Sequence, residues 1–371
     1  MSTINGTDVN LLISHYEKFC QSVEYRRNEE FYSKENPIIE LSYNENPLGP
    51  GQMAINAIKY HSEFAHLYPP IDYHVLIERL ATQLNLSNKN VLISAGSVAA
   101  IYLAVFQFAG DGDQVIYSKS SIPWYRWCAV GNNSIPVEVP LLPDMNHDLE
   151  SILKSINNRT KVIILSNPHN PTGLYIAENQ LLDFYKRIPE NVLLIVDQAY
   201  YEYQSTQETL LIKLVNEVPN LMLTRTFSKI HGLAGLRVGY AMSNERTISA
   251  LKAKWLGSMP TISTLSVFAA LHALDDKAHI EKSILYNNKI KSDLNRIATE
   301  FNLRSLNSEA NFITINIHDS IKNENLFTME GIRFTPGYFY GYKEWARFSF
   351  HYKNELMINK IQYAFSLISK L

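Results

Sequence analysis

Short apolar runs alternate with helical patterns through much of the chain, and this alternation restricts the fold more than any other feature of the sequence. The helical patterns cover residues 98–108, 177–187 and 244–255. The apolar runs predict strands at residues 91–94, 114–117, 136–139, 161–165, 192–196, 221–223 and 237–241. Such an order is typical of an α/β domain whose mostly parallel sheet is covered by helices on both faces.

The pattern changes after Pro260. Helices are predicted at residues 263–275, 278–301 and 353–371, and short strands at 311–317, 331–335 and 346–350. This order indicates a second, smaller α+β domain. We therefore divide the chain into an N-terminal arm that joins the small domain (1–44), a large domain (45–255) and a small C-terminal domain (256–371). The arm lacks a core of its own and needs another surface to pack on.

The composition excludes several classes of protein. The chain has 371 residues, of which 46% are hydrophobic and 19% charged, so it can bury a large core and differs from a disordered protein. A net charge of -2 argues against nucleic acid as a partner. Its two cysteines, Cys20 and Cys128, are too few for a disulfide framework, and we expect no bound metal. Because no run approaches the roughly 20 apolar residues of a membrane span, we expect a cytoplasmic protein with no membrane partner.

Polar side chains stand where three of the predicted strands end. The motif Asn167-Pro-His-Asn-Pro-Thr-Gly173 follows one strand, Asp197 ends the next, and Lys229 follows a third. The carboxyl ends of parallel strands meet at one edge of a sheet, which is where ligands bind in open α/β sheets. A buried acid such as Asp197 needs a positive partner, and a protonated pyridine nitrogen would supply one.

Hydroxyl groups and cations gather around Lys229. Thr226 and Ser228 precede it, and Arg237 follows. A lysine can form an imine with an aldehyde if burial lowers its pKa, while an arginine and hydroxyls bind phosphate. Residues 94–98, which read Ser-Ala-Gly-Ser-Val, join another strand to a helix N-terminus, and this also favours a phosphate. The set therefore indicates a ligand that carries both an aldehyde and a phosphate.

Together these motifs resemble those of the fold-type I pyridoxal-phosphate aminotransferases, and within them the histidinol-phosphate aminotransferase branch. The resemblance extends from Leu41-Ser-Tyr-Asn-Glu-Asn-Pro-Leu-Gly49 to Trp345-Ala-Arg347-Phe. It implies a large domain with a mostly parallel mixed sheet flanked by helices, and a smaller α+β domain. It also implies pyridoxal 5'-phosphate as the cofactor and a homodimer as the assembly.

The resemblance assigns a role to each matching residue. It implies that Lys229 binds the cofactor and shuttles a proton, and that Asp197 keeps the pyridine nitrogen protonated. Tyr200, the third catalytic residue, is implied to hydrogen-bond the phenolic oxygen of the cofactor. The other implied cofactor contacts are Asn170 beside that oxygen, the stacking Trp124, the phosphate ligands Gly96, Ser97, Val98, Thr226, Ser228 and Arg237, and Tyr68 from across a dimer interface. The implied substrate contacts are the carboxylate-binding Arg347 with Tyr43, Asn170 and Arg333.

Four positions depart from the pattern of the histidinol-phosphate branch. That branch usually has arginine at the places of Leu67 and Thr335, and an acidic residue at those of Gln198 and Val98. The arginine at the place of Thr335 helps to bind the substrate phosphate. Arg333 lies two residues earlier, would point to the same side of a strand, and could replace it. If it does not, histidinol phosphate is a poor substrate.

The motifs favour the transfer of an amino group between an amino acid and a 2-keto acid. We expect a donor with an α-carboxylate and a polar or aromatic side chain, with Tyr43, Trp124 and Tyr338 as pocket walls. Decarboxylation, or elimination with cyclisation, on the same scaffold remains an alternative, because these reactions also need Lys229 and Asp197. A regulator built on this fold would carry a basic DNA-binding domain, for which the N-terminal arm is too short.

Overall fold

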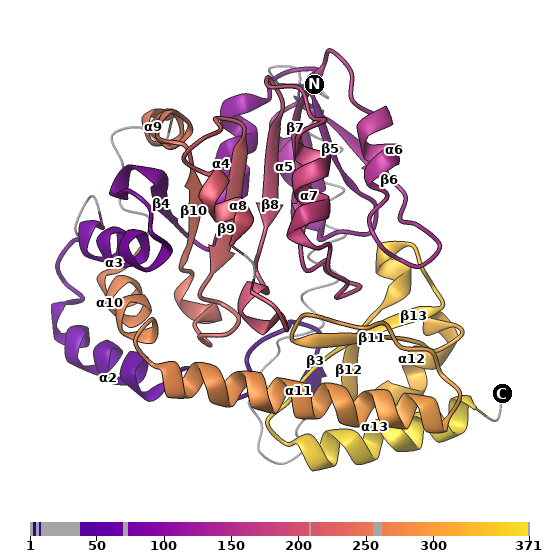
Figure 1. The fold of residues 1–371 in the computed structure, drawn as a ribbon. Helices are drawn as coiled ribbons and strands as arrows, with labels where there is room; N and C mark the ends of the chain where they lie inside the picture. The colour runs from indigo at the N-terminus through magenta and orange to yellow at the C-terminus, as the bar shows by residue number, and fades with distance from the viewer. Residues whose placement is uncertain are drawn as a thin grey trace.

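The structure is a computed structural model that describes residues 3–4, 7–8, 38–69, 73–207, 209–254 and 262–369. Figure 1 shows a large sheet enclosed by helices, with a small sheet beneath it that is backed by the long helix α11 (Lys277–Glu300). Most of the predicted N-terminal arm lies outside the described residues, as do the last residues of the helices predicted at 244–255 and 353–371. Two short strands, β1 (Thr3–Ile4) and β2 (Thr7–Asp8), pair in antiparallel fashion.

The large sheet has seven strands in the order β4-β10-β9-β8-β7-β5-β6. They are β4 (Val91–Ser94), β5 (Gln114–Ser118), β6 (Ile135–Val139), β7 (Thr160–Ser166), β8 (Leu193–Asp197), β9 (Leu221–Thr226) and β10 (Gly239–Ser243). Only β10 runs antiparallel to its neighbours, β4 and β9, which confirms the predicted mostly parallel mixed sheet. The predicted start of the last strand at residue 237 is wrong, because Arg237 has a left-handed φ of 55° that a strand cannot continue.

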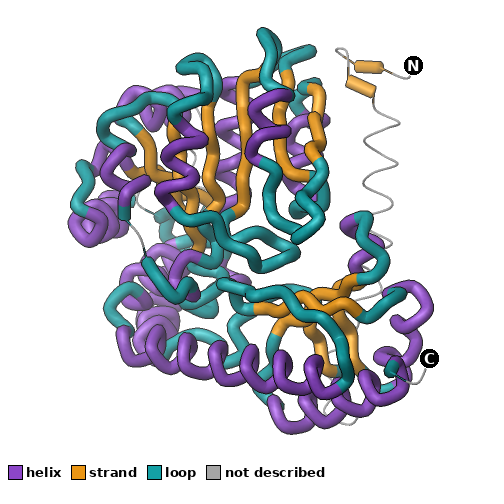
Figure 2. Tube along the Cα trace, turned by 45° about the vertical axis from the view of Figure 1, so that its right-hand side comes forward, coloured by secondary structure: helices purple, strands orange, loops and turns teal. Residues whose placement is uncertain are grey.

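Alternate residues of the central strands enter two cores, one on each face of the large sheet. Val162 and Ile164 of β7 pack with one set of helices, and Ile163 and Leu165 with another. The first set is α4 (Ser97–Phe108), α5 (Pro123–Gly131) and α9 (Glu245–Lys254). The second set includes α2 (Gln52–His61), α3 (His74–Leu84), α6 (Leu149–Lys154), α7 (Glu178–Tyr185), α8 (Leu210–Leu214) and α10 (Thr264–Ala273). Both faces are therefore covered, as Figure 2 shows from a second direction.

The small sheet has four strands in the order β11-β13-β12-β3. They are β3 (Ile39–Leu41), β11 (Phe312–Asn316), β12 (Ile332–Pro336) and β13 (Trp345–Ser349). Phe334 and Phe348 pack into a core with α11 and two more helices, α12 (Ser320–Met329) and α13 (Asn354–Ile368). Because side chains alternate along a strand, Thr335 and Arg347 lie on the opposite face of this sheet. The end of the predicted arm, at β3, contributes an edge strand here.

The remaining short helices are η2 (Ser62–Phe64), η3 (Asn88–Asn90), η4 (Tyr201–Tyr203), η5 (Ala234–Leu236) and η6 (Gly337–Tyr340).

The predicted domain boundary at residue 255 stays a prediction, since α10 follows it and yet packs in the core of the large sheet. Within the described residues, no helix is both long enough and apolar enough to cross a membrane.

Candidate active site

A set of anion-binding donors lies where β4 turns into α4. Gly96 has a φ of +80°, and a β-carbon there would lie 2.7 Å from Nη2 of Arg237. Helix α4 begins at Ser97 without a side-chain cap, so its first backbone N–H groups are available to an anion. The Thr226 and Ser228 hydroxyls, 2.9 Å apart, stand at the carboxyl end of β9. Gly239 of β10 pairs with Ser94 of β4 on one side and with Thr226 on the other, which brings these donors to the same edge of the sheet. Glycine, free N–H groups, hydroxyls and a guanidinium are the donor set that a phosphate needs.

The carboxylate of Asp197 is fixed at the end of β8. Only 2% of the residue is exposed, and each of its oxygens accepts a hydrogen bond. Tyr125 donates to Oδ2 at 2.9 Å, and Thr224 donates to Oδ1 at 3.0 Å. Burial raises the pKa of Asp197, while the Tyr125 and Thr224 hydrogen bonds oppose that rise by stabilising the ionised form. A buried, oriented carboxylate of this kind suits a cationic ring nitrogen as partner.

The Tyr200 hydroxyl joins the two sheets. It accepts hydrogen bonds from Nδ2 of Asn44 and from Nδ2 of Asn170, each at 3.0 Å. Asn44 follows β3 of the small sheet, whereas Asn170 follows β7 of the large sheet. Burial raises the pKa of Tyr200 to about 12, so the phenol keeps its proton at neutral pH and can donate it to a ligand.

The ε-amino group of Lys229 lies between these groups. Its Nζ donates to the main-chain oxygen of Tyr43 at 3.0 Å. Burial is the main cause that lowers the pKa of Lys229 to about 8; the nearby charge of Arg347 acts in the same direction, and Glu45 opposes it. About a tenth of the Lys229 side chains are therefore neutral at pH 7, and this form can act as a nucleophile or a base.

Arg347 of β13 reaches the same site from the small sheet. Its Nη1 donates to Oδ1 of Asn170, and its Nη2 donates to the hydroxyl of Thr335 at 2.9 Å. The residue is only 5% exposed, so its charge acts on Lys229 and Tyr200 through a medium with little water. Asn170 thus contacts both the arginine and Tyr200, and it connects the two halves of the site.

These residues fit pyridoxal phosphate. The donor set around Gly96 and Arg237 suits its phosphate, Asp197 its ring nitrogen, Tyr200 with Asn170 its phenolic oxygen, and Lys229 its aldehyde. Among the residues that the structure describes, no group of three or more histidine, cysteine or acidic side chains could hold a metal ion.

Comparison with known proteins identifies the family. Residues 36–361 match the family described as aminotransferase class I and II. The chain belongs to this family. Histidinol-phosphate aminotransferase of Caldicellulosiruptor saccharolyticus is 35% identical over 302 residues, which cover 81% of this chain and 84% of the relative. The enzyme of the same name from Bacillus subtilis strain 168 is 34% identical over 282 residues, or 75% of this chain and 77% of the relative.

Solved structures agree with this family assignment. Histidinol-phosphate aminotransferase from Sinorhizobium meliloti in complex with pyridoxal-5'-phosphate superposes with a TM-score of 0.83 at 25% identity, over 90% of this chain and 91% of that one. A Thermus thermophilus aspartate aminotransferase mutant, at 18% identity and a TM-score of 0.81, shares the fold. The chain is therefore a pyridoxal-phosphate-dependent aminotransferase of the histidinol-phosphate branch, acting on amino and keto acids. The relatives give no support to decarboxylation or elimination.

Some of the predicted site residues lie outside the cluster just described. Tyr68 is 91% exposed. Trp124 is the second residue of α5 and makes an edge-to-face contact with Trp127, so its stacking role stays a prediction. Arg333 lies on β12 opposite Glu40 of β3. The hydroxyl of Tyr338, predicted as a pocket wall, donates to Glu324 of α12 at 2.9 Å. Val98 is the second residue of α4, where it can offer only its main chain to an anion.

Sequence reasoning missed several residues of the site. Tyr125 follows Trp124 directly, yet a single buried tyrosine in a short helix carries no recognisable signal. Thr224 lies two residues before Thr226 on the same strand, and this alternation could have placed its hydroxyl beside Asp197. Asn44 is inside the motif that supports the resemblance. Tyr340, which contacts Arg347 at 3.0 Å, lies in a segment without periodicity, so nothing in the sequence points to it.

Proposed function

We propose that this aminotransferase moves the amino group of an amino acid with a free α-carboxylate to a 2-keto acid, and that histidinol phosphate is not its preferred substrate. The observation that carries the proposal is the set of hydrogen bonds around Arg347. The position where the branch commonly has a second arginine is Thr335, whose hydroxyl accepts from Arg347 Nη2 and donates to the Ser42 oxygen at 3.2 Å. The site therefore offers one arginine, which suits a planar carboxylate better than a phosphate dianion.

The residues divide the chemistry between them. Bound pyridoxal phosphate carries the amino group and withdraws electrons from the substrate α-carbon. Asp197 holds the positive charge of the ring nitrogen, and Arg347 orients the substrate through its carboxylate. Lys229, with a pKa of about 8, takes the proton from the α-carbon at Nζ and returns it. Tyr200 and Asn170 keep the phenolic oxygen in place, so that each step meets a fixed geometry.

Arg333 is the residue that could restore phosphate binding, and its surroundings argue against that role. It is the register partner of Glu40, so the two opposite charges lie side by side on one face of the small sheet. It lies one pleat repeat, about 6.6 Å along the strand, from Thr335. Both features favour a structural role in the sheet.

Steady-state kinetics test the substrate proposal. A panel of amino acids and histidinol phosphate is compared as donors with 2-oxoglutarate as acceptor. The loss of charge-assisted hydrogen bonds from an arginine predicts that histidinol phosphate is poorer than the best amino acid by about 10-fold or more in kcat/KM. If histidinol phosphate has the highest kcat/KM of the panel, the proposal is wrong and the chain serves the reaction of its relatives.

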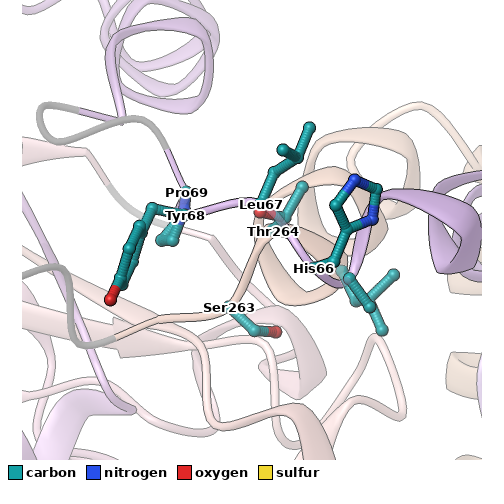
Figure 3. A pocket seen from close by; sticks show the side chains of 8 residues that line it. His66, Leu67, Tyr68, Pro69, Ser263 and Thr264 are labelled. Atoms are coloured by element: carbon teal, nitrogen blue, oxygen red, sulfur yellow. The ribbon is translucent and has the colours of Figure 1, made fainter.

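We further propose that the aminotransferase is a homodimer in which Tyr68 completes the partner's site. Tyr60 and Leu67, 71% and 53% exposed, lie near it in the sequence and are apolar in character. A pocket lies between residues 65–69 and residues 263–265, and Figure 3 shows the Tyr68 ring extending away from His66 and Leu67 on its rim. An exposed group of large apolar side chains around a hollow favours burial by another protein surface.

Subunit mixing tests this assembly. Tyr68→Ala and Lys229→Ala are each expected to be strongly impaired. A hybrid dimer has one site with both native residues, so a randomised mixture is expected to recover up to about a quarter of the native activity. Sedimentation of the active protein as a monomer would exclude the dimer. Mixed dimers without recovered activity would remove Tyr68 from the partner's site.

We also propose a cytoplasmic location. Cys128 is buried with its thiol free, which suits a reducing compartment. Fractionation of the native cells, with the protein expected in the cytoplasmic fraction, tests this.

A further inference from the structure

Both Nη atoms of the Arg347 guanidinium are already hydrogen-bonded to protein groups. Nη1 donates to Oδ1 of Asn170 and to the Tyr340 hydroxyl, the latter at 3.0 Å. Nη2 donates to the Ser42 main-chain oxygen and to the Thr335 hydroxyl. The remaining nitrogen, Nε, is buried and finds no hydrogen-bond partner among the described residues. Every Nη proton thus points at a protein acceptor. A substrate carboxylate can therefore bind to the Nη atoms only if one of these acceptors leaves.

Three of these acceptors are fixed by other contacts. The Ser42 oxygen belongs to the main chain of a buried residue. Thr335 is the register partner of Arg347 in the small sheet, and its hydroxyl also donates to Ser42. Asn170 is held at its other end, because its Nδ2 donates to Tyr200. Moving any of them would break a second buried hydrogen bond or a strand pairing.

Tyr340 differs from these three acceptors. It is only partly buried and ends η6, a single turn of 3-10 helix after β12. Its hydroxyl accepts from Arg347 and donates to no group in the part of the chain that the structure describes. The Arg347 Cζ lies 5.8 Å from the centre of the Tyr340 ring and 5.4 Å from that of Phe312, so the guanidinium has an aromatic ring near it on two sides. The hydroxyl can therefore leave at the cost of one neutral acceptor.

We propose that the Tyr340 hydroxyl occupies the seat of the substrate carboxylate in the free enzyme and that the carboxylate of an amino or keto acid displaces it. This inference rests on the proposed function, in which Arg347 binds that carboxylate. Tyr340 keeps a buried cation hydrogen-bonded and correctly oriented between turnovers. A ligand can replace the hydroxyl only if it accepts a hydrogen bond more strongly than a phenol does. An ionised carboxylate is such an acceptor. Tyr340 is thus a specificity-determining residue that selects anionic ends.

The main-chain oxygen of Tyr340 is hydrogen-bonded to the large domain. It accepts a hydrogen bond from the hydroxyl of Ser120, which follows β5. The backbone of the turn is therefore anchored on both domains, whereas the hydroxyl is held by Arg347 alone. This arrangement lets the ring move without moving η6.

The proposal is tested by whether the dissociation constant of 2-oxoglutarate falls or rises when the Tyr340 hydroxyl is removed. In holoenzyme in the pyridoxal form, 2-oxoglutarate is a non-reacting probe of the carboxylate site, and calorimetry gives its dissociation constant. Tyr340→Phe keeps the ring and removes the competing acceptor, so the constant is expected to fall by about 2- to 10-fold. In turnover, KM should fall by a similar factor without a rise in kcat. A constant that stays equal or rises would overturn the proposal.

Two controls separate the possible failures. Tyr286→Phe removes another partly buried phenol of the small domain, which donates to the main-chain oxygen of His351 at 2.7 Å, and should leave the constant unchanged. Arg347→Lys should weaken 2-oxoglutarate strongly. If it does not, the proposed carboxylate site itself is wrong, whatever Tyr340 does.

A second measurement serves if Tyr340→Phe proves unstable. In a crystal structure of the native holoenzyme with 2-oxoglutarate, the Tyr340 hydroxyl should lie beyond hydrogen-bond reach of Nη1. A hydroxyl that still accepts from Nη1 beside a bound carboxylate would equally refute displacement.

Discussion

The two halves of the active site are built in different ways. The cofactor half uses the ends of strands in one sheet, and Asp197 finds its partners Thr224 and Tyr125 within the large domain. In the substrate half, the acceptors around Arg347 come from segments far apart in the sequence, including Ser42 and Tyr340. The first half takes most of its residues from one sheet, with hydrogen bonds that join Tyr200 to Asn44 and Lys229 to Tyr43 beside β3, whereas the second exists only where the two domains meet.

This difference indicates which half can change without loss of the reaction. Most cofactor contacts come from the ends of strands of the large sheet, so a substitution there damages the chemistry itself. The substrate contacts Thr335 and Arg347 lie buried on the face of the small sheet that meets the site, where Thr335 replaces the arginine common in the branch. Substitutions in the first half should therefore abolish turnover, and those in the second should change KM.

The largest effect is expected at Lys229. Lys229→Ala should lower kcat by about 10⁴-fold, because it removes the group that holds the cofactor and moves the proton. Borohydride treatment should label Lys229 in the native enzyme and nothing in the variant. Lys291→Ala is the matched control, since Lys291 is also a lysine whose pKa burial lowers, and its Nζ donates to the Ser308 oxygen. An equal loss in both variants would contradict the assignment.

Asp197→Asn should rank second. Leaving a buried cation without its anion costs about 3–5 kcal/mol, which predicts a loss of roughly 10²- to 10³-fold in kcat/KM and weaker cofactor binding. Equilibrium dialysis of pyridoxal phosphate and steady-state rates measure the two effects. Thr224→Val, which removes only one hydrogen bond to the carboxylate, should cost about 10-fold or less. Native activity in Asp197→Asn would show that the ring nitrogen needs no anion here.

Arg347→Lys should affect binding rather than the cofactor. A lysine cannot supply the planar fork, so KM for the keto acid should rise by about 10- to 100-fold while the cofactor stays bound. Arg333→Lys, on the same face of the small sheet, should change KM by about 3-fold or less. Equal effects of the two substitutions would mean that the substrate anion does not sit at Arg347.

The pKa of Lys229 gives a smaller, pH-dependent effect. Because burial and Arg347 lower this pKa to about 8, only the minority neutral form captures the cofactor below that pH. The rate of cofactor uptake by the apoprotein should rise about 10-fold per pH unit up to pH 8 and then level off. Arg347→Gln removes a lowering charge, so the midpoint should move upward and uptake at pH 7 should slow. A pH-independent rate, followed by stopped-flow absorbance, would refute the role of the neutral amine.

The sequence predicted the strands that carry the cofactor half for a local reason. An apolar strand that ends in Asp197, or leads into Lys229, marks the chain wherever the strand is recognised, and all the predicted strands of the large sheet are present. The start of β10 could not be predicted, since the left-handed φ of Arg237 leaves no mark in the apolar pattern of the strand. Short helices such as α5 were also missed, because one or two turns do not repeat an apolar period often enough.

The substrate half could not be predicted in the same way. Arg347 was assigned through its motif. Ser42 lies in the motif of residues 41–49 but had no assigned role, and Tyr340 lies in a short turn without any pattern. Only the pairing of β12 with β13 brings Thr335 opposite Arg347, and only the contact between domains adds Asn170. Long-range pairings of this kind follow from tertiary packing, which local periodicity does not encode.

The smallest effect is expected at Thr335, and it measures how much the substrate half depends on one hydroxyl. Thr335→Val keeps the shape of the side chain and removes the acceptor that Arg347 Nη2 reaches at 2.9 Å. Nη2 retains the Ser42 oxygen, so the arginine stays in place, but Nη2 keeps one of its two acceptors. A hydrogen bond of this kind contributes about 0.5–1.5 kcal/mol net, which predicts a rise of roughly 2- to 10-fold in KM with kcat unchanged. Thr335→Ser restores the hydroxyl and should behave like the native enzyme. If Thr335→Val also behaves like the native enzyme, the strand pairing alone orients Arg347, and the substrate half is as firmly built as the cofactor half.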